Sequence, residues 1–475
     1  NGVPVEEFES IPVWRGPPAT RYGSGAMGGV VNSVTKKVSK ELKGQVNLYA
    51  NQPQDSKEGA TRRIGFNLSG PIIQDTLGFR IYGNLNKTDA DAADINAGHG
   101  NDSAAGVEGV RNKDIAGRLQ WKISPAQTLI LDSSYSRQGN IYNGDTQNSN
   151  PRSALVNSLA DGKAETARLY RSAYSLTHDG AWEWGDTKNV ISYERTVNSH
   201  LPEGLAGGPE GSYTGLDFVQ SRLKNLRFSS EANIPFKLGV DNVLTVGAEF
   251  TDSKLDDPAS NTQGFTDQKK TDVFDGISAT RGGKASQRNW AAYVEDNISL
   301  TDKTHLIPAI RFDHNSASGS NWSPALNFSH QIGENWLVKG GIARAYKAPN
   351  LYQTNPDFIL YTRGQGCPID APGSVRCYYM GNNNLKPETS INKEIGLEFN
   401  KNGWQASATY FHNAYRNKIV IGENIIATSN IGNWLLQWEN TQKATISGIE
   451  GNLVIPLHDT LKRSNNFTYI KKSED

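Results

Sequence analysis

The sequence predicts an all-β protein, an antiparallel transmembrane β-barrel preceded by a short glycine-rich segment. Three observations predict this fold. Segments of about ten residues alternate apolar and polar side chains. Short turns alternate with long polar connections, and aromatic residues stand at the ends of the segments. These features are typical of barrels that cross a bacterial outer membrane.

The composition excludes a helical membrane protein and is compatible with a barrel. The 475 residues include 47 Gly and 2 Met, and the mean hydropathy is −0.57. No stretch contains the roughly 18 apolar residues that a membrane-spanning helix needs. A barrel strand alternates lipid-facing apolar residues with polar residues that face the lumen, so its average composition is hydrophilic.

Charge and cysteine content limit the possible partners. The 49 basic and 49 acidic residues give a formal net charge of zero, so we expect no nucleic-acid partner. The two cysteines, Cys367 and Cys377, stand in a stretch rich in Gly and Pro, which suits one disulfide in an oxidising compartment. Two free thiols are the alternative. Zinc would need four ligands, and no His lies nearby.

The repeating unit is visible in the first segments after residue 44. Gln45–Ala50, Arg63–Ser69 and Gly78–Asn86 each alternate with a period of two. In the third segment one face carries Phe79, Ile81, Gly83 and Leu85, and the other carries Arg80, Tyr82, Asn84 and Asn86. Each segment is therefore predicted to be a strand with an apolar face and a polar face.

The connections differ systematically in length, which separates a membrane barrel from a soluble sandwich. Short turns are predicted at 123–127, 180–186, 300–303 and 401–403, and long polar connections at 89–110, 139–165, 201–216, 254–284 and 350–386. The aromatic residues at strand ends are expected to form interfacial girdles; they are Trp121, Trp182, Trp184, Tyr193, Trp290, Tyr293, Trp322 and Trp336. Aromatic packing within a soluble sheet is the alternative.

The two ends of the chain suggest a fragment or a processed chain. It begins at Asn1 without a Met or an apolar targeting run. About seventeen strands are predicted over residues 44–473, whereas single-chain bacterial barrels have an even number and must close. We therefore expect further strands to be missing after Asp475.

The segment before the strands has a different character. It reads Trp14-Arg15-Gly16-Pro17-Pro18-Ala19-Thr20-Arg21-Tyr22-Gly23-Ser24-Gly25-Ala26-Met27-Gly28-Gly29-Val30-Val31-Asn32, followed by Thr35-Lys36-Lys37. A phosphate-binding loop is the obvious alternative for such a glycine-rich stretch. It is excluded because no Gly-Lys-Ser/Thr follows and no strand–loop–helix unit surrounds the segment.

This segment resembles the end of the plug domain in TonB-dependent receptors. The resemblance continues through the barrel and is closest to ferric enterobactin receptors; it includes Tyr135-Ser136-Arg137-Gln138-Gly139-Asn140, Asn321-Trp322-Ser323-Pro324, Arg344-Ala345-Tyr346-Lys347-Ala348-Pro349 and Ile391-Asn392-Lys393-Glu394. It implies that residues 1–37 are the C-terminal part of the plug. Residues 38–475 would be an incomplete barrel with about 17 of about 22 strands. The pattern usual before Arg15-Gly16-Pro17 is lost at Glu9–Trp14.

The resemblance also implies a ligand-binding loop. A ferric catecholate complex is a bulky trianion with aromatic faces, so its binder needs fixed cations and aromatic surface. Tyr361, Arg363, Gln365 and Tyr378 match ligand-contacting positions of the family, and a Cys367–Cys377 disulfide would reduce the cost of ordering the loop. A solvated Arg363 and a girdle Tyr361 are the alternative. At two other positions where relatives have tyrosines this chain has Glu423 and Leu436.

A second implied set is mechanical. In the family, arginines of the plug pair with glutamates of the barrel, and the matching residues are Arg15, Glu394 and Glu450. Ion pairs in a hydrated lumen suit a seated but releasable plug, because their strength depends on geometry and solvation. Polar lumen residues with loose partners are the alternative.

The resemblance implies a monomeric outer-membrane receptor that takes up a ferric siderophore. TonB would act through a segment preceding Asn1, and lipopolysaccharide, phage and bacteriocins are further expected partners. We expect no enzyme activity and no cofactor, with iron carried only as ligand. The nearest catalytic cluster, Asp313-His314-Asn315, has no placed serine. The alternatives are a passive or adhesive barrel and a receptor for another siderophore.

Overall fold

The structure is a computed structural model of the 475-residue chain. It describes residues 8–10, 13–14, 30–31, 34–35, 38–92, 94–96, 105–144, 153–202, 213, 215–258, 274–275, 277, 282–362, 367–368 and 370–474. Within this part of the chain no helix is long and apolar enough to cross a membrane.

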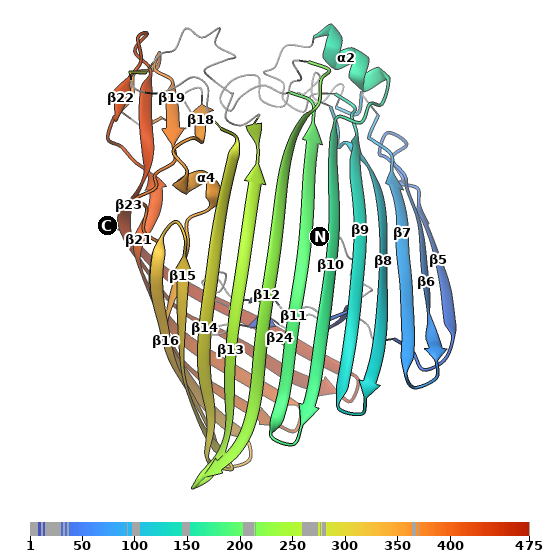
Figure 1. The fold of residues 1–475 in the computed structure, drawn as a ribbon, viewed down its shortest axis with the longest axis vertical. Helices are drawn as coiled ribbons and strands as arrows, with labels where there is room; N and C mark the ends of the chain where they lie inside the picture. Colours follow the sequence, from blue (N-terminus) through green and yellow to red (C-terminus); the bar gives the residue numbers. More distant parts are fainter. Residues whose placement is uncertain are drawn as a thin grey trace.

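Long antiparallel strands make up most of the molecule (Figure 1). The first of them are β5 (Lys43–Asn51), β6 (Thr61–Ile73), β7 (Leu77–Thr88), β8 (Gly109–Ser124), β9 (Gln127–Ile141), β10 (Ala167–Trp182), β11 (Gly185–His200), β12 (Val219–Leu238) and β13 (Val240–Asp256). They continue with β14 (Lys284–Thr301), β15 (Thr304–Asn315), β16 (Gly319–Ile332), β17 (Trp336–Lys347), β20 (Glu388–Lys401), β21 (Trp404–Ile421), β23 (Trp434–His458) and β24 (Leu461–Glu474). The seventeen long strands predicted from the sequence are thus confirmed within the described residues.

The sheet curls into a barrel in which each strand pairs with the next along the chain. β17 pairs directly with β20, since β18 and β19 belong to the connection between them. The strand order places β24 beside β5. Every residue of these two strands is exposed, and the backbone registers found in the described chain join β5 to β6 and β24 to β23. The seam between β5 and β24 is therefore more open than the rest of the wall.

The two faces of the wall differ in polarity, as the period of two predicts. On β8, Ile115, Leu119 and Trp121 point outward and are 41–50% exposed. Asp114 and Arg118 alternate with them and point inward. Uncovered apolar side chains on every second residue form a lipid-facing surface, and the polar face lines the lumen.

The short turns gather at one end of the barrel and the long connections at the other (Figure 1). At the short-turn end, Asn402 and Gly403 have φ values of 52° and 86°, as an Asn-Gly hairpin requires. Gly239 alone, with φ 74°, joins β12 to β13. The long-connection end carries α2 (Ala154–Asp161), α4 (Leu351–Thr354), β18 (Ile359–Thr362), β19 (Cys377–Met380) and β22 (Ala427–Thr428). The predicted alternation of connection lengths is confirmed, although residues 316–318 form a short connection at the long-connection end.

Tyr293 does not belong to an outer aromatic girdle, so this part of the prediction was wrong. Trp290 lies on the outer face of β14, 46% exposed. Tyr293 is three residues away and therefore points to the opposite face. Its hydroxyl donates a hydrogen bond to Glu231 at 3.1 Å, and its ring faces Arg311 on the lumen side.

The described residues of the N-terminal segment form two small sheets of two strands. β1 (Phe8–Ser10) pairs with β4 (Val34–Thr35), and β2 (Val13–Trp14) pairs with β3 (Val30–Val31). Residues 15–29, which include Arg15 and the glycine-rich motif, lie outside the described residues. The proposed boundary between a plug at 1–37 and a barrel at 38–475 stays a prediction.

Candidate ligand-binding site and barrel interior

A small sheet at the long-connection end contains the strands that flank the predicted ligand loop. β18 and β19 form an antiparallel hairpin in which Tyr361 lies opposite Tyr378. β19 also runs parallel to the outer part of β23, with Cys377 opposite Trp434, and β22 adds to the same part of β23. Residues far apart in sequence are thereby joined by backbone pairing above the barrel wall.

The predicted disulfide between Cys367 and Cys377 is present, with a Cα–Cα distance of 5.5 Å. Thr362 pairs with Cys377 across the hairpin. Cys377 is therefore bonded to both flanks of residues 363–366. It pairs through the backbone with Thr362 on one side and through the disulfide with Cys367 on the other. Arg363 and Gln365 fall in this interval and lie outside the described residues.

Tyr378 is placed in the interior of the loop sheet. Its side chain is 0% exposed and packs with Phe274, Ile359 and Leu435. The Phe274 and Tyr378 rings meet edge to face, with centroids 5.3 Å apart. Contact between Tyr378 and a ligand would require the ring to leave this cluster. Of Tyr361 only the backbone is described.

Tyr379 is a residue of this site that the sequence reasoning missed. Its ring lies on the other face of β19, packed with Cys377 and Leu436, and burial raises the pKa of its phenol to about 12. Among the described residues its buried hydroxyl has no hydrogen-bond partner, which is uncommon for a buried polar group. The only available signal was its position next to Tyr378. Leu436 is fully buried in the same cluster, whereas Glu423 is exposed.

Glu394 and Glu450 both face the lumen. On β20 and β23 they alternate with the outward residues Ile395 and Ile449. Their strands lie on either side of β21, and their positions differ by two residues in register. The structure thus brings them to neighbouring parts of the lumen wall. Pairing with Arg15 stays a prediction, because Arg15 is outside the described residues.

A buried ion network in the lumen wall was not predicted. Arg311 of β15 contacts Glu249 of β13 at 2.6 Å and Asp313 at 3.0 Å, and its side chain is only 3% exposed. The Tyr293 ring lies 5.5 Å from its guanidinium carbon. Residues 311 and 313 are two apart on a strand and share a face, which was the signal available in the sequence.

Asp313 and His314 are neighbours on β15, so their side chains point to opposite faces of the barrel wall. His314 faces outward, where its Nδ1 lies 2.9 Å from Ser320 Oγ, while Asp313 faces inward and contacts Arg311. A catalytic triad built from this cluster would need both groups on one face.

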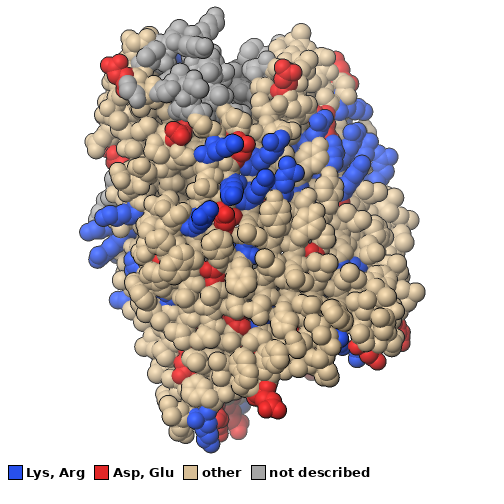
Figure 2. Space-filling model, in the orientation of Figure 1, with Lys and Arg blue, Asp and Glu red and all other residues tan. Residues whose placement is uncertain are grey.

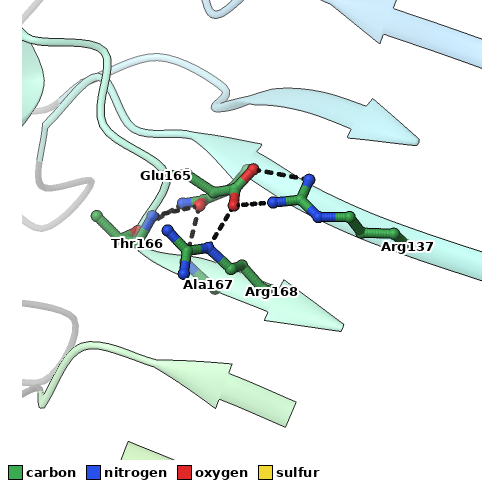
Figure 3. A network of polar contacts seen from close by, with 6 residues as sticks. Arg137, Glu165, Thr166, Ala167 and Arg168 are labelled. Atoms are coloured by element: carbon green, nitrogen blue, oxygen red, sulfur yellow. Dashed lines mark hydrogen bonds and ion pairs between the residues drawn. The ribbon is translucent and has the colours of Figure 1, made fainter. Parts of the chain in front are cut away.

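Arg137 of β9 contacts the β9–β10 connection (Figure 3). Glu165 lies between Arg137, whose Nη2 is 2.5 Å from Glu165 Oε1, and Arg168, whose Nε also donates to it. Burial would raise the pKa of Glu165, but the two arginines outweigh it and hold the pKa below its ordinary range. A Cβ on Gly139 would come within 2.2 Å of the Glu165 carboxylate, so glycine leaves room for the network.

The sequence of the chain is similar to that of a known protein family. The family model described as "TonB dependent receptor-like, beta-barrel" matches residues 111–475. The chain is 50% identical over 482 residues to the ferric enterobactin receptor PirA of Pseudomonas aeruginosa, and 48% identical over 486 residues to the ferrienterobactin receptor of Escherichia coli. Each alignment covers 100% of this chain and 64% of the relative, so the chain spans less than two thirds of these relatives.

Solved structures agree with the fold. The siderophore receptor PirA from Acinetobacter baumannii superposes with a TM-score of 0.88 at 46% identity, over 100% of this chain and 68% of that chain. A mutant ferric enterobactin receptor from P. aeruginosa in complex with enterobactin gives a TM-score of 0.89 at 45% identity, over 99% and 68%.

The fold and the lipid-facing surface define an outer-membrane β-barrel. The chain belongs to the TonB-dependent receptor-like β-barrel family. The relatives named above are receptors.

Proposed function

We propose that the full-length protein is a TonB-dependent outer-membrane receptor that binds ferric catecholate siderophores such as ferric enterobactin and transports them to the periplasm. The loop sheet would hold the ligand at the long-connection end of the barrel. No covalent chemistry and no resident cofactor are needed in this scheme, since iron enters only as part of the ligand.

The observation that carries the proposal is the way Cys377 fixes both flanks of residues 363–366. A short loop held at both flanks pays less entropy when it orders around a ligand. Arg363 offers a planar, permanently charged fork that can both pair with catecholate oxygens and stack on their rings. Gln365 adds amide donors, and Tyr361, which lies opposite Tyr378 in the hairpin, adds a phenol group.

The relatives support the same loop. Solved structures of the P. aeruginosa ferric enterobactin receptor include alanine mutants of an arginine and of a glutamine two positions later, alone and combined. Arg363 and Gln365 have this spacing in the present chain. The two mutants with a single change are described as complexes with enterobactin. We assign Arg363 and Gln365 as ligand contacts on these grounds.

Transport requires a plug that stays seated until TonB acts on it. Glu394 and Glu450 lie on the lumen wall, where their carboxylates can form ion pairs with Arg15 of the plug. Such pairs are stabilising when their geometry is good and weaken when hydration or geometry changes. They therefore suit a device that must hold and then release. TonB would engage the plug through a segment outside this chain.

Uptake measured in cells tests the proposal. The full-length protein is expressed in a host that lacks its own catecholate receptors, with TonB present or absent, and iron-labelled ferric enterobactin is supplied. Uptake is expected only when both the receptor and TonB are present. Uptake that persists without TonB would favour a passive barrel, and no uptake with normal surface expression would reject catecholate transport.

A further inference from the structure

The loop sheet, formed by β18, β19, β22 and the outer part of β23, is attached to the barrel through α4 as well as through β23. α4 follows β17 and begins the connection that leads to β18 at the long-connection end (Figure 1). Asn350 caps this turn, because its Oδ1 accepts a hydrogen bond from the Gln353 amide at 2.8 Å. Gln353 Oε1 in return accepts one from the Asn350 amide at 3.1 Å. A turn capped in both directions has a defined orientation.

α4 contacts both sides of the root of the β13–β14 connection. The root is closed by the backbone, since the Asp257 amide donates a hydrogen bond to the Gly283 carbonyl at 2.7 Å. On the β13 side, the Tyr352 hydroxyl donates to Asp257 Oδ2 at 2.6 Å. On the β14 side, Asn355 Nδ2 donates to the Lys284 carbonyl at 3.2 Å. The two connections are therefore joined at their base.

Asp257 is a buried carboxylate. Lys and Arg side chains gather at the surface near the long-connection end of the wall in Figure 2, whereas Asp257, at the same end, is only 6% exposed. Burying a carboxylate costs free energy unless hydrogen bonds replace its water, and the Tyr352 hydroxyl supplies one. Burial and the neighbouring Asp257 raise the pKa of Tyr352 above its ordinary value of 10.0, so the phenol keeps its proton and stays a donor.

The ring of Tyr352 carries this attachment to the loop sheet. It meets the Phe358 ring edge to face, with centroids 5.0 Å apart. Phe358 is 1% exposed and directly precedes Ile359, the first residue of β18. Its carbonyl accepts a hydrogen bond at 3.0 Å from the amide of Gly381, which follows β19. Tyr352 is thus held by Asp257 at its hydroxyl and supports the base of the hairpin with its ring.

A second contact joins the same two connections farther from the barrel wall. Phe274 belongs to the β13–β14 connection, is 1% exposed, and packs with Ile359 and Tyr378 of the loop sheet. The β13–β14 connection therefore meets the loop sheet twice, at its root through Asp257 and again through Phe274. Two separate attachments restrain both the position and the orientation of the sheet.

We propose that Tyr352 and Asp257 are positioning residues for ligand recognition. Their hydrogen bond, together with the packing of Phe274 on Tyr378, holds β18 and β19 in the arrangement that the ligand meets. Neither Tyr352 nor Asp257 contacts the ligand in this scheme. Holding the binding strands in place before the ligand arrives reduces the ordering cost of binding. The inference rests on the proposed function, because it assumes that the segment between β18 and β19 binds a ferric catecholate.

Titration of the full-length protein with ferric enterobactin, followed by fluorescence quenching, tests the assignment. Tyr352→Phe keeps the ring on Phe358 and removes only the hydroxyl, and we expect the affinity to fall about tenfold. Asp257→Ala should match it, and the double variant should be no weaker than either single variant, because both changes break the same hydrogen bond. Asp257→Asn keeps an oxygen acceptor and should lose less than about threefold.

The matched control is Tyr213→Phe, which removes a hydroxyl that lies 2.9 Å from Thr166 Oγ1 in other connections of the same end. It should bind normally. Uptake by cells separates positioning from loss of folded receptor. In Tyr352→Phe the half-saturating ligand concentration should rise, while the saturating uptake rate per surface receptor should stay unchanged.

Hydrogen exchange of the unliganded protein tests the physical cause. Amides of 359–362 and 377–380 should exchange faster in Tyr352→Phe and normally in Tyr213→Phe. Unchanged affinity of Tyr352→Phe, or equal weakening by Tyr213→Phe, would overturn the inference and leave the proposed function in place. No binding by the unmodified protein would instead reject the proposed function, and unchanged exchange in Tyr352→Phe would then overturn the inference on its own.

Discussion

Cys377 is bonded to Cys367 and lies opposite Thr362 in the β18–β19 hairpin, so one residue fixes both flanks of the four-residue interval 363–366. Because Cys377 also pairs with Trp434 of β23, this interval is connected to a strand of the barrel wall. The two flanks of the interval are thus held by a small sheet above the barrel wall.

Removing the disulfide should weaken siderophore binding without unfolding the barrel. Cys367→Ser with Cys377→Ser leaves the hairpin register in place but frees one flank of the interval. A disulfide that closes a short loop typically contributes about 2–4 kcal/mol by restricting the chain when it is not ordered. Only part of this free energy would appear in ligand binding, so we expect the affinity to fall about tenfold. Quenching of intrinsic fluorescence by ferric enterobactin measures it. Unchanged affinity in the double variant would show that the loop is ordered by other contacts.

The buried Arg311 should matter much more for stability than an exposed ion pair of the same wall. Arg311→Gln leaves Glu249 and Asp313 without their charge partner, and breaking a buried pair typically costs about 3–5 kcal/mol. Lys339→Gln is the matched control, because Lys339 lies 2.7 Å from Glu398 with both side chains at least 40% exposed. That change should cost less than about 1 kcal/mol. Urea unfolding in micelles compares the two variants, and equal costs would contradict the assigned role of burial.

The Glu165 network should depend on pH. The pKa of Glu165 is lowered from its ordinary value of 4.5, so its contribution is complete above that pH and is lost as the pH falls through the lower folded-state pKa. Hydrogen exchange of residues 153–166 should be faster in Glu165→Gln than in the unmodified protein at neutral pH. The two should converge in acid, after correction for intrinsic exchange. Glu58→Gln, in another connection, should show no difference at any pH.

The long strands and their faces could be predicted because a lipid-facing wall imposes strict alternation. Ile115 and Arg118 of β8 are three residues apart, an odd number, so the sequence predicts that they face opposite sides of the wall. In the structure Ile115 faces outward and Arg118 faces the lumen. The same rule was neglected for Tyr293, which was assigned to a girdle by its residue type alone. Parity with Trp290 would have placed it in the lumen.

The arrangement of the loop site could not be predicted to the same depth. The Cys367–Cys377 pair was predicted from cysteine count and composition and the Tyr361–Tyr378 segment by resemblance, but the burial of Tyr378 depends on Phe274 and Leu435, which are distant in sequence. The Arg311 network likewise joins strands whose register no local pattern specifies. Long-range pairing, rather than local propensity, decides which side chains meet.

Direct titration with ferric enterobactin tests the central claim, that the interval held by Cys377 recognises a ferric catecholate. Arg363→Ala and Gln365→Ala are compared with Lys57→Ala, an exposed cation of another connection. Loss of a charge-assisted contact of about 1.5–3 kcal/mol predicts a loss of roughly tenfold to a hundredfold for Arg363→Ala. Gln365→Ala should lose less, Lys57→Ala should bind normally, and a ferric hydroxamate should bind none of the proteins. Equal affinity in the unmodified protein and Arg363→Ala would contradict the claim.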